Sequence, residues 1–190
     1  MYYVGLIGDK SGDIYGATAF GGTNGTGTVW ELVYSKSSNF YSEKILYTFG
    51  STSRGAANYP YGGLVMDGTG TRYGTAEQGG STPNSGTVYK LTKSGSTWTE
   101  SIVHNFAGGS SDGQDPSGNL LLGSDGNLYG MAQFGGSSND GIVYSITRKK
   151  VKGKLRGQDE PVASFWKRKK SFSAVQTWSH PYQRSPRGSS

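Results

Sequence analysis

The chain has 190 residues, enough for one domain of ordinary size with an additional segment. Leu, Ile, Val and Phe together number 33, about 17% of the chain, which is below the roughly 20% that globular proteins usually exceed. However, 13 tyrosines and 4 tryptophans add apolar surface, so the composition is compatible with a folded, aromatic-rich β protein. The absence of cysteine excludes disulfides, thiolate metal sites and thiol nucleophiles. No apolar run is long enough for a membrane-spanning helix, and the first residues do not resemble a signal peptide.

Charge and glycine divide the sequence near residue 147. Residues 1–147 carry 7 Lys/Arg and 11 Asp/Glu, a net charge of −4, whereas residues 148–190 carry 12 and 2, a net charge of +10. Of the 32 glycines, 29 lie in the first part. We therefore expect an acidic, glycine-rich body over 1–147 and a basic, disordered tail over 148–190. The overall positive charge is then no evidence that the body binds nucleic acid.

The beginning of the chain predicts four short strands. They are β-branched or aromatic runs separated by Gly, Asn, Asp and Ser, and apolar residues do not recur at helical spacing. The expected strands cover residues 5–7, 14–18, 27–34 and 43–49.

The same pattern then recurs twice. Tyr-Gly pairs begin at Tyr15, Tyr73 and Tyr129, and each is followed at the same offset by a Gly-Gly pair and then by a Gly-x-Val-aromatic segment. These matches predict three repeats, at about 2–60, 61–116 and 117–147, of which the third lacks a convincing last strand. Units of four antiparallel strands at this period are typical of propeller blades, and such small sheets must stack on one another to bury both faces.

The motifs resemble the GloVer repeat (Gloeo/Verruco type), found in tandem-repeat bacterial proteins that are often secreted or attached to the cell surface. The resemblance covers residues 2–147 and is carried by segments such as Gly12-Asp13-Ile14-Tyr15-Gly16 and Gly126-Asn127-Leu128-Tyr129-Gly130. The middle copy departs from the pattern, because Thr71-Arg72 stands where Asn-Leu is usual. The resemblance implies a β-propeller-like fold and an exposed location, and it brings no catalytic residue or cofactor.

The number of repeats is below the four to eight blades of closed propellers. Three interpretations follow: a piece of a longer repeat protein, an assembly of several chains, or an open array. We favour the first, so the sequence predicts a partial, about three-bladed, propeller-like array.

The tail contains two basic clusters, at 148–156 and 167–170. With Trp166 and Trp178 nearby, they could form an arm that binds nucleic acid or another anionic surface. We favour irregular, solvated sequence outside the original reading frame, because the clusters interrupt a repeat and share no pattern with the body. A third interpretation makes residues 160–165 a degenerate fourth strand, which Pro161 would restrict to a sheet edge.

Several acidic residues are candidate ligands for a metal ion. Asp9 and Asp67 share one repeat position, and Asp13 and Asn127 share another, so they could supply oxygen ligands to Ca²⁺. Asp and Asn beside Gly more simply build tight turns, which is the interpretation we adopt. The acidic loop that contains Asp112 and Asp115 is expected to be a solvated connection.

No catalytic arrangement emerges. His104 lies in a predicted strand at the position of Tyr47 and is expected to be packed, and spacing alone cannot pair Glu31, Glu77 and Glu100. Gly21-Gly22 and its copies lie between strands, which argues against a phosphate-binding loop. We therefore assign no catalytic, cofactor or metal residue.

The leading hypothesis is a non-enzymatic binding module or scaffold, secreted or on the cell surface, with a surface polymer or a protein as partner. One alternative is a propeller-type carbohydrate-active hydrolase or lyase. A second is association with nucleic acid or an anionic surface through the tail.

Overall fold

A computed structural model describes residues 5–50, 55–82 and 84–147. It confirms the predicted all-β fold of four-stranded antiparallel units, since these residues contain one 3-10 turn (Gly109–Ser111) and no α-helix. The first sheet follows chain order: β1 (Ile7–Gly8), β2 (Ile14–Thr18), β3 (Thr28–Ser35), β4 (Phe40–Thr48). The second has the same plan: β6 (Val65–Met66), β7 (Arg72–Ala76), β9 (Thr87–Ser94), β10 (Thr97–Asn105).

The third sheet is built around β13 (Leu128–Gly135). One edge of β13 pairs with β14 (Ile142–Ile146), and the other pairs with both β11 (Gly113–Pro116) and β12 (Leu121–Leu122). Within the described ranges, no strand pairs with the outer edge of β14, where β4 and β10 lie in the other two sheets. Over the described residues, the third sheet therefore has no counterpart of β4 or β10.

Short strands also link each repeat to the next. A two-stranded sheet joins β5 (Ala57–Asn58) to β8 (Gln78–Gly79), which directly follows β7. The corresponding strand of the third sheet is β11. Both β5 and β11 come before the predicted repeat boundaries yet pair with strands of the repeat that follows. The chain thus begins each new sheet a few residues earlier than the Tyr-Gly and proline motifs suggest.

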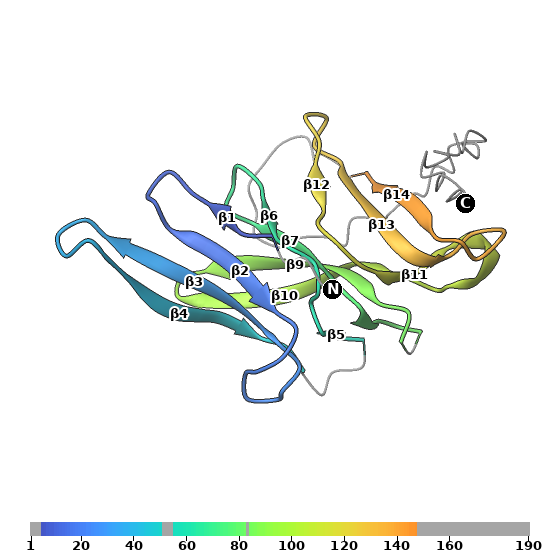
Figure 1. Cartoon of the computed structure of the whole chain (residues 1–190), viewed down its shortest axis with the longest axis horizontal. Helices are drawn as coiled ribbons and strands as arrows, with labels where there is room; N and C mark the ends of the chain where they lie inside the picture. The colour runs from blue at the N-terminus through green and yellow to red at the C-terminus, as the bar shows by residue number, and fades with distance from the viewer. Residues whose placement is uncertain (1–4, 51–54, 83, 148–190) are drawn as a thin grey trace, which may run out of the picture.

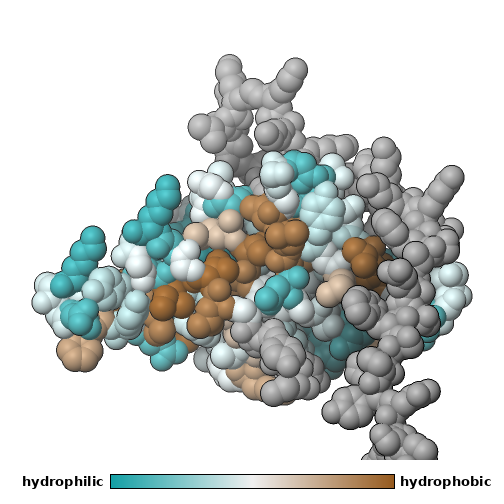
Figure 2. Space-filling view, turned by 45° about the horizontal axis from the view of Figure 1, so that its top comes forward, coloured by the Kyte–Doolittle hydropathy of each residue, from teal (hydrophilic) through white to brown (hydrophobic). Residues whose placement is uncertain are grey.

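The three sheets lie side by side, with the first and third at the two ends of the array (Figure 1). One buried cluster fills the space between the first and second sheets, and another fills the space between the second and third. The same ring contact occurs in both: Phe49 meets Tyr89 edge-on at 5.0 Å between ring centroids, and Phe106 meets Tyr144 at 5.1 Å. Hydrophobic side chains gather over the middle of the molecule in Figure 2, whereas its left end is mostly hydrophilic.

The Tyr-Gly motif has a packing explanation. Gly74 pairs with Tyr89, and Gly130 pairs with Tyr144 on the neighbouring strand of the same sheet. A Cβ added at either glycine would overlap that tyrosine ring, which lies across the bare backbone. Glycine is therefore required at these positions, because a side chain there would occupy the space of the tyrosine ring. That ring also contacts the phenylalanine of the preceding sheet.

We expect Gly74→Ala to lower the free energy of unfolding by about 1–3 kcal/mol, since the added Cβ would overlap the ring of Tyr89, which is completely buried. Urea denaturation followed by tyrosine and tryptophan fluorescence measures the change. Gly68→Ala is the control, because a Cβ there meets nothing within 4 Å, and we expect an effect within about 0.5 kcal/mol. Equal stability of the two variants would contradict the packing requirement.

Candidate functional site

The repeated aspartates are used by their own hairpins. Asp9 Oδ1 accepts hydrogen bonds from the backbone N–H of Ser11 (2.8 Å) and Asp13 (3.1 Å), and its Oδ2 accepts one from the Tyr15 hydroxyl (2.8 Å). Asp67 does the same in the second repeat, with the Tyr73 hydroxyl at 3.2 Å. These bonds lower the pKa of Asp9 against the opposing effect of burial, which is the larger single influence. The turn interpretation accounts for both residues.

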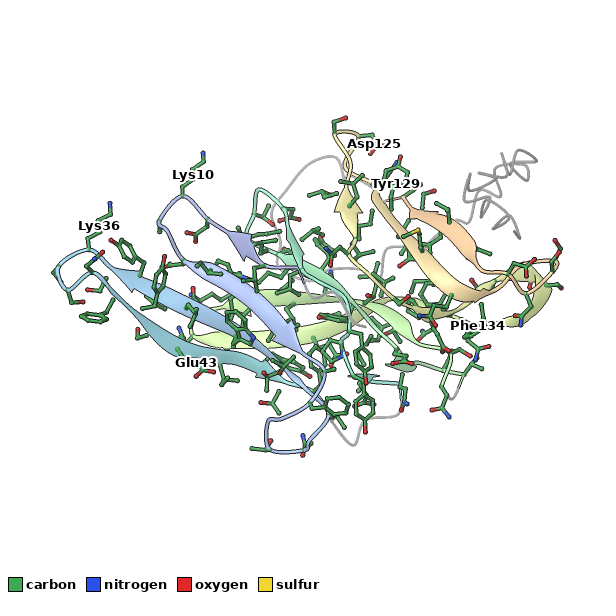
Figure 3. The ribbon with its side chains drawn as sticks, in the orientation of Figure 1. Lys10, Lys36, Glu43, Asp125, Tyr129 and Phe134 are labelled. Carbon is green, nitrogen blue, oxygen red and sulfur yellow. The ribbon has the colours of Figure 1, made fainter. Side chains whose placement is uncertain are left out.

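In the third hairpin, an aspartate again accepts a hydrogen bond from the tyrosine hydroxyl, but this aspartate lies two residues later in the turn. Gly123 occupies the place of Asp9 and Asp67 in the turn, and Asp125 accepts the Tyr129 hydroxyl at 2.6 Å. Asp125 and Tyr129 project together from the β12–β13 hairpin (Figure 3). Asp13, the other calcium candidate, accepts the backbone N–H of Tyr34 at 2.7 Å. Over the described residues, no group of three or more His, Asp or Glu side chains is placed to hold a metal ion.

Glu100 holds the first two sheets together. It lies on β10, largely buried, and accepts hydrogen bonds from the Tyr47 hydroxyl (2.8 Å) and the backbone N–H of Ala57 (2.8 Å). Burial raises its pKa, and the two hydrogen bonds offset part of that effect. The sequence could not pair Glu100 with another group because its partners lie 53 and 43 residues away. Its role is structural, since both carboxylate oxygens have protein partners.

His104 and Asp112 form a buried pair at the next junction. His104 lies on β10, packs edge-on against Phe106, and its Nε2 is 3.4 Å from Asp112 Oδ2. The prediction of a packed strand residue is therefore correct for His104. The expectation that Asp112 belongs to a solvated connection is wrong: its carboxylate is nearly buried and also accepts the backbone N–H of Ala107 (2.9 Å) and Gly113 (2.7 Å). Its carboxylate lies between the two sheets because β11 pairs with β13.

Arg72, the departure from the repeat pattern, is buried between two rings. Its guanidinium carbon lies 4.1 Å from the centroid of Tyr15 and 4.3 Å from that of Trp98, and Nη1 donates to the Gly70 carbonyl at 2.8 Å. The charge is thus sandwiched between aromatic faces at the junction of the first two sheets. This environment gives Arg72 a packing role and no access to a ligand.

Three aromatic residues, one of them exposed and two half-buried, gather at one end of the first junction. Phe20, which follows β2, meets Tyr59 at 5.7 Å and Tyr61 at 6.0 Å between ring centroids. Phe20 is 63% exposed, and Tyr59 has a left-handed backbone with φ of 56°, an unusual conformation for a bulky residue. A hydrogen bond from Tyr59 N–H to the Thr26 carbonyl (3.0 Å) holds it there. We call Phe20, Tyr59 and Tyr61 the aromatic platform.

Two acidic residues, Glu77 and Asp115, are related to Tyr59, one by a backbone hydrogen bond and the other by its equivalent place in the repeat. Glu77 donates its backbone N–H to the Tyr59 carbonyl (3.1 Å), and its pKa is raised by burial and by the charge of Asp115. Asp115 occupies the position in the third repeat that Tyr59 has in the second, with φ of 53°, and burial raises its pKa. The expectation of a solvated connection is wrong for Asp115 too, because it lies half-buried in β11. The sequence contained one usable signal: both residues directly precede a repeated proline.

The remaining sequence candidates do not add to this site. Glu31 Oε2 lies 3.9 Å from Lys44 Nζ on the neighbouring strand. Gly21 and Gly22 form a turn between β2 and β3. The tail clusters, Trp166, Trp178 and residues 160–165 lie outside the described residues. No helix in the part that the structure describes is long and apolar enough to cross a membrane.

The pH dependence of stability tests the account of Glu100. Because its pKa in the folded chain is raised above the ordinary value of 4.5, its stabilising contribution is complete below that value and is lost as the pH rises through the raised pKa. We expect Glu100→Gln to remove this loss, so that the variant gains stability relative to the natural chain as the pH rises from about 4 to about 7. Urea denaturation at each pH measures the difference.

Glu43→Gln is the matched control, because Glu43 has the corresponding position on β4 and is exposed (Figure 3). Its stability relative to the natural chain should change little over the same range. A flat difference for Glu100→Gln as well would contradict the raised pKa.

The comparisons with known proteins agree with the repeats. Searches of curated proteins and of solved structures found no match. The family model of the Gloeobacter/Verrucomicrobia repeat matches residues 2–162, which includes all three sheets and extends beyond the predicted end of the third repeat. Because this family model covers most of the chain, the chain belongs to the Gloeobacter/Verrucomicrobia repeat family.

Proposed function

We propose that the chain is a non-enzymatic binding module, a propeller-like repeat scaffold that is secreted or displayed on the cell surface. Its ionisable side chains support this proposal, because most of them already have structural partners. The hairpins use Asp9, Asp67 and Asp125, and the junctions between sheets use Glu100 and Asp112. Repeat arrays of this kind present extended surfaces to their partners.

The aromatic platform is the observation that carries the proposal. The ring of Phe20 contacts the rings of both Tyr59 and Tyr61, while Phe20 remains 63% exposed. The strained backbone of Tyr59 is consistent with a functional position, since strain of this kind tends to persist where a side chain must be held in place. An exposed ring that contacts two tyrosines, each with a hydroxyl group, suits a polysaccharide, whose sugar rings have apolar faces and hydroxyl edges. We therefore propose a polysaccharide as the ligand.

Affinity electrophoresis against a panel of neutral and acidic polysaccharides tests this ligand class, with isothermal titration calorimetry for any polymer that retards the chain. We expect Phe20→Ala and Tyr61→Ala each to weaken binding by about tenfold or more, as the loss of an aromatic anchor does at other interfaces. Phe40→Ala is the matched control, because Phe40 is equally exposed but lies at the opposite end of the first sheet. Retardation that all three variants retain would contradict the role of the platform.

The carbohydrate-active enzyme is the second candidate, and the pair of Glu77 and Asp115 favours it. A carboxyl with a raised pKa can act as a general acid while a second carboxylate serves as base or nucleophile. Product analysis with any polysaccharide that binds distinguishes the two functions. Turnover that is abolished by Glu77→Gln or Asp115→Asn while binding persists would overturn the non-enzymatic proposal. Binding without products supports it.

A further inference from the structure

The residues on the two outer faces of the array are more exposed than the residues at the equivalent positions of the other repeats. On the third sheet, Val143 is 80% exposed, whereas Val29 and Val88 at the same position of the other repeats are 0% exposed. Tyr129 is half-exposed, although Tyr15 and Tyr73 are buried. We define the trailing face as the side of the third sheet that is turned away from the second, formed by Leu121, Tyr129, Met131 and Val143.

The first sheet shows the complementary difference on its opposite side. Tyr89 and Leu91 of the second sheet are completely buried against the first, and their counterparts in the third sheet are buried against the second. The equivalent residues of the first sheet, Trp30 and Leu32, are only half-buried. We define the leading face as the outward side of the first sheet, formed by Ile14, Trp30, Leu32 and Ile45.

The chain itself contains two examples of how such faces combine. Between the first and second sheets, the trailing side contributes Tyr15 and Val29, and the leading side contributes Tyr89 and Leu91, to one buried cluster. The equivalent sides of the second and third sheets form the other cluster. Apart from the last strand, for which the third sheet has no counterpart among the described residues, the trailing and leading faces have the kinds of residue found on the surfaces that pack together twice within this molecule.

We propose that the trailing face of one copy packs against the leading face of a second copy, so that the chain associates head to tail. This contact would continue the packing between sheets with the same kinds of residue on each side. The proposal goes beyond the binding function and does not depend on it. A head-to-tail interface closes into a ring or extends into a filament. Two copies supply six sheets, within the four to eight of closed propellers.

Sedimentation velocity of the full chain over a hundredfold range of concentration is the first test. We expect reversible association that Val143→Glu weakens by about tenfold or more, because it places a charge in the apolar contact. Val143 is so exposed in the single chain that the substitution should leave its circular dichroism and melting unchanged. Phe40→Glu is the matched control, since Phe40 is a 74% exposed apolar residue outside both faces, and it should leave the association constant unaltered. A chain that stays monomeric over the whole range would overturn the proposal.

Cysteine cross-linking tests the orientation of the two copies. Because the natural chain has no cysteine, only the introduced residues can form a disulfide. We expect Val143→Cys and Leu32→Cys chains to form a disulfide-linked pair under mild oxidation only when they are mixed. Cross-linking of Val143→Cys with itself, and not with Leu32→Cys, would show trailing faces in contact with each other and would overturn the head-to-tail arrangement. The two substitutions leave the aromatic platform intact, so failure here does not affect the proposed polysaccharide binding.

Discussion

The contact between a tyrosine ring, the glycine beside it and the phenylalanine of the preceding sheet determines most of this structure. Each sheet is too small to bury both of its faces, so its stability depends on a neighbour. The ring of Tyr89 lies over Gly74 in its own sheet and meets Phe49 of the first, and Tyr144 repeats this with Gly130 and Phe106. One aromatic side chain therefore joins strand pairing to sheet stacking. This explains how a chain poor in aliphatic residues can form two buried clusters, since large rings supply the buried area.

The stacking of the sheets also determines which carboxylates are buried and which donors they meet. Strand ends and turns bring carboxylates to the junctions, where burial is costly unless donors are present. Glu100 finds the Tyr47 hydroxyl and a backbone N–H, and Asp112 finds two backbone N–H groups and His104. These acids bind successive repeats to one another. The raised pKa of Glu100 is a consequence of its burial at the junction, and it is not by itself a sign of catalysis.

The sequence predicted the strands, the three repeats and the family, because each depends on local spacing that recurs. Tyr15, Tyr73 and Tyr129 mark equivalent strands, and the turn role of Asp9 follows from the glycine next to it. The aromatic platform could not be predicted, because Phe20 and Tyr59 are 39 residues apart and meet only after two sheets stack. Asp112 and Asp115 were misjudged for the same reason: nothing local indicates that the segment before Pro116 pairs with β13.

Comparison of equivalent positions separates residues that form the fold from residues that can carry function. Where all three repeats use the same kind of side chain, as at Val29, Val88 and Val143, the position serves stacking, and its exposure reports whether a neighbouring sheet is present. Where equivalent positions differ while the backbone conformation stays the same, the shared fold alone does not determine the side chain. Tyr59 and Asp115 share a left-handed backbone and a hydrogen bond to the preceding repeat, yet one carries a ring and the other a carboxylate. Since both positions share this conformation, the difference lies in what each side chain meets at its own junction: Tyr59 meets the ring of Phe20, whereas the charge of Asp115 adds to burial in raising the pKa of Glu77.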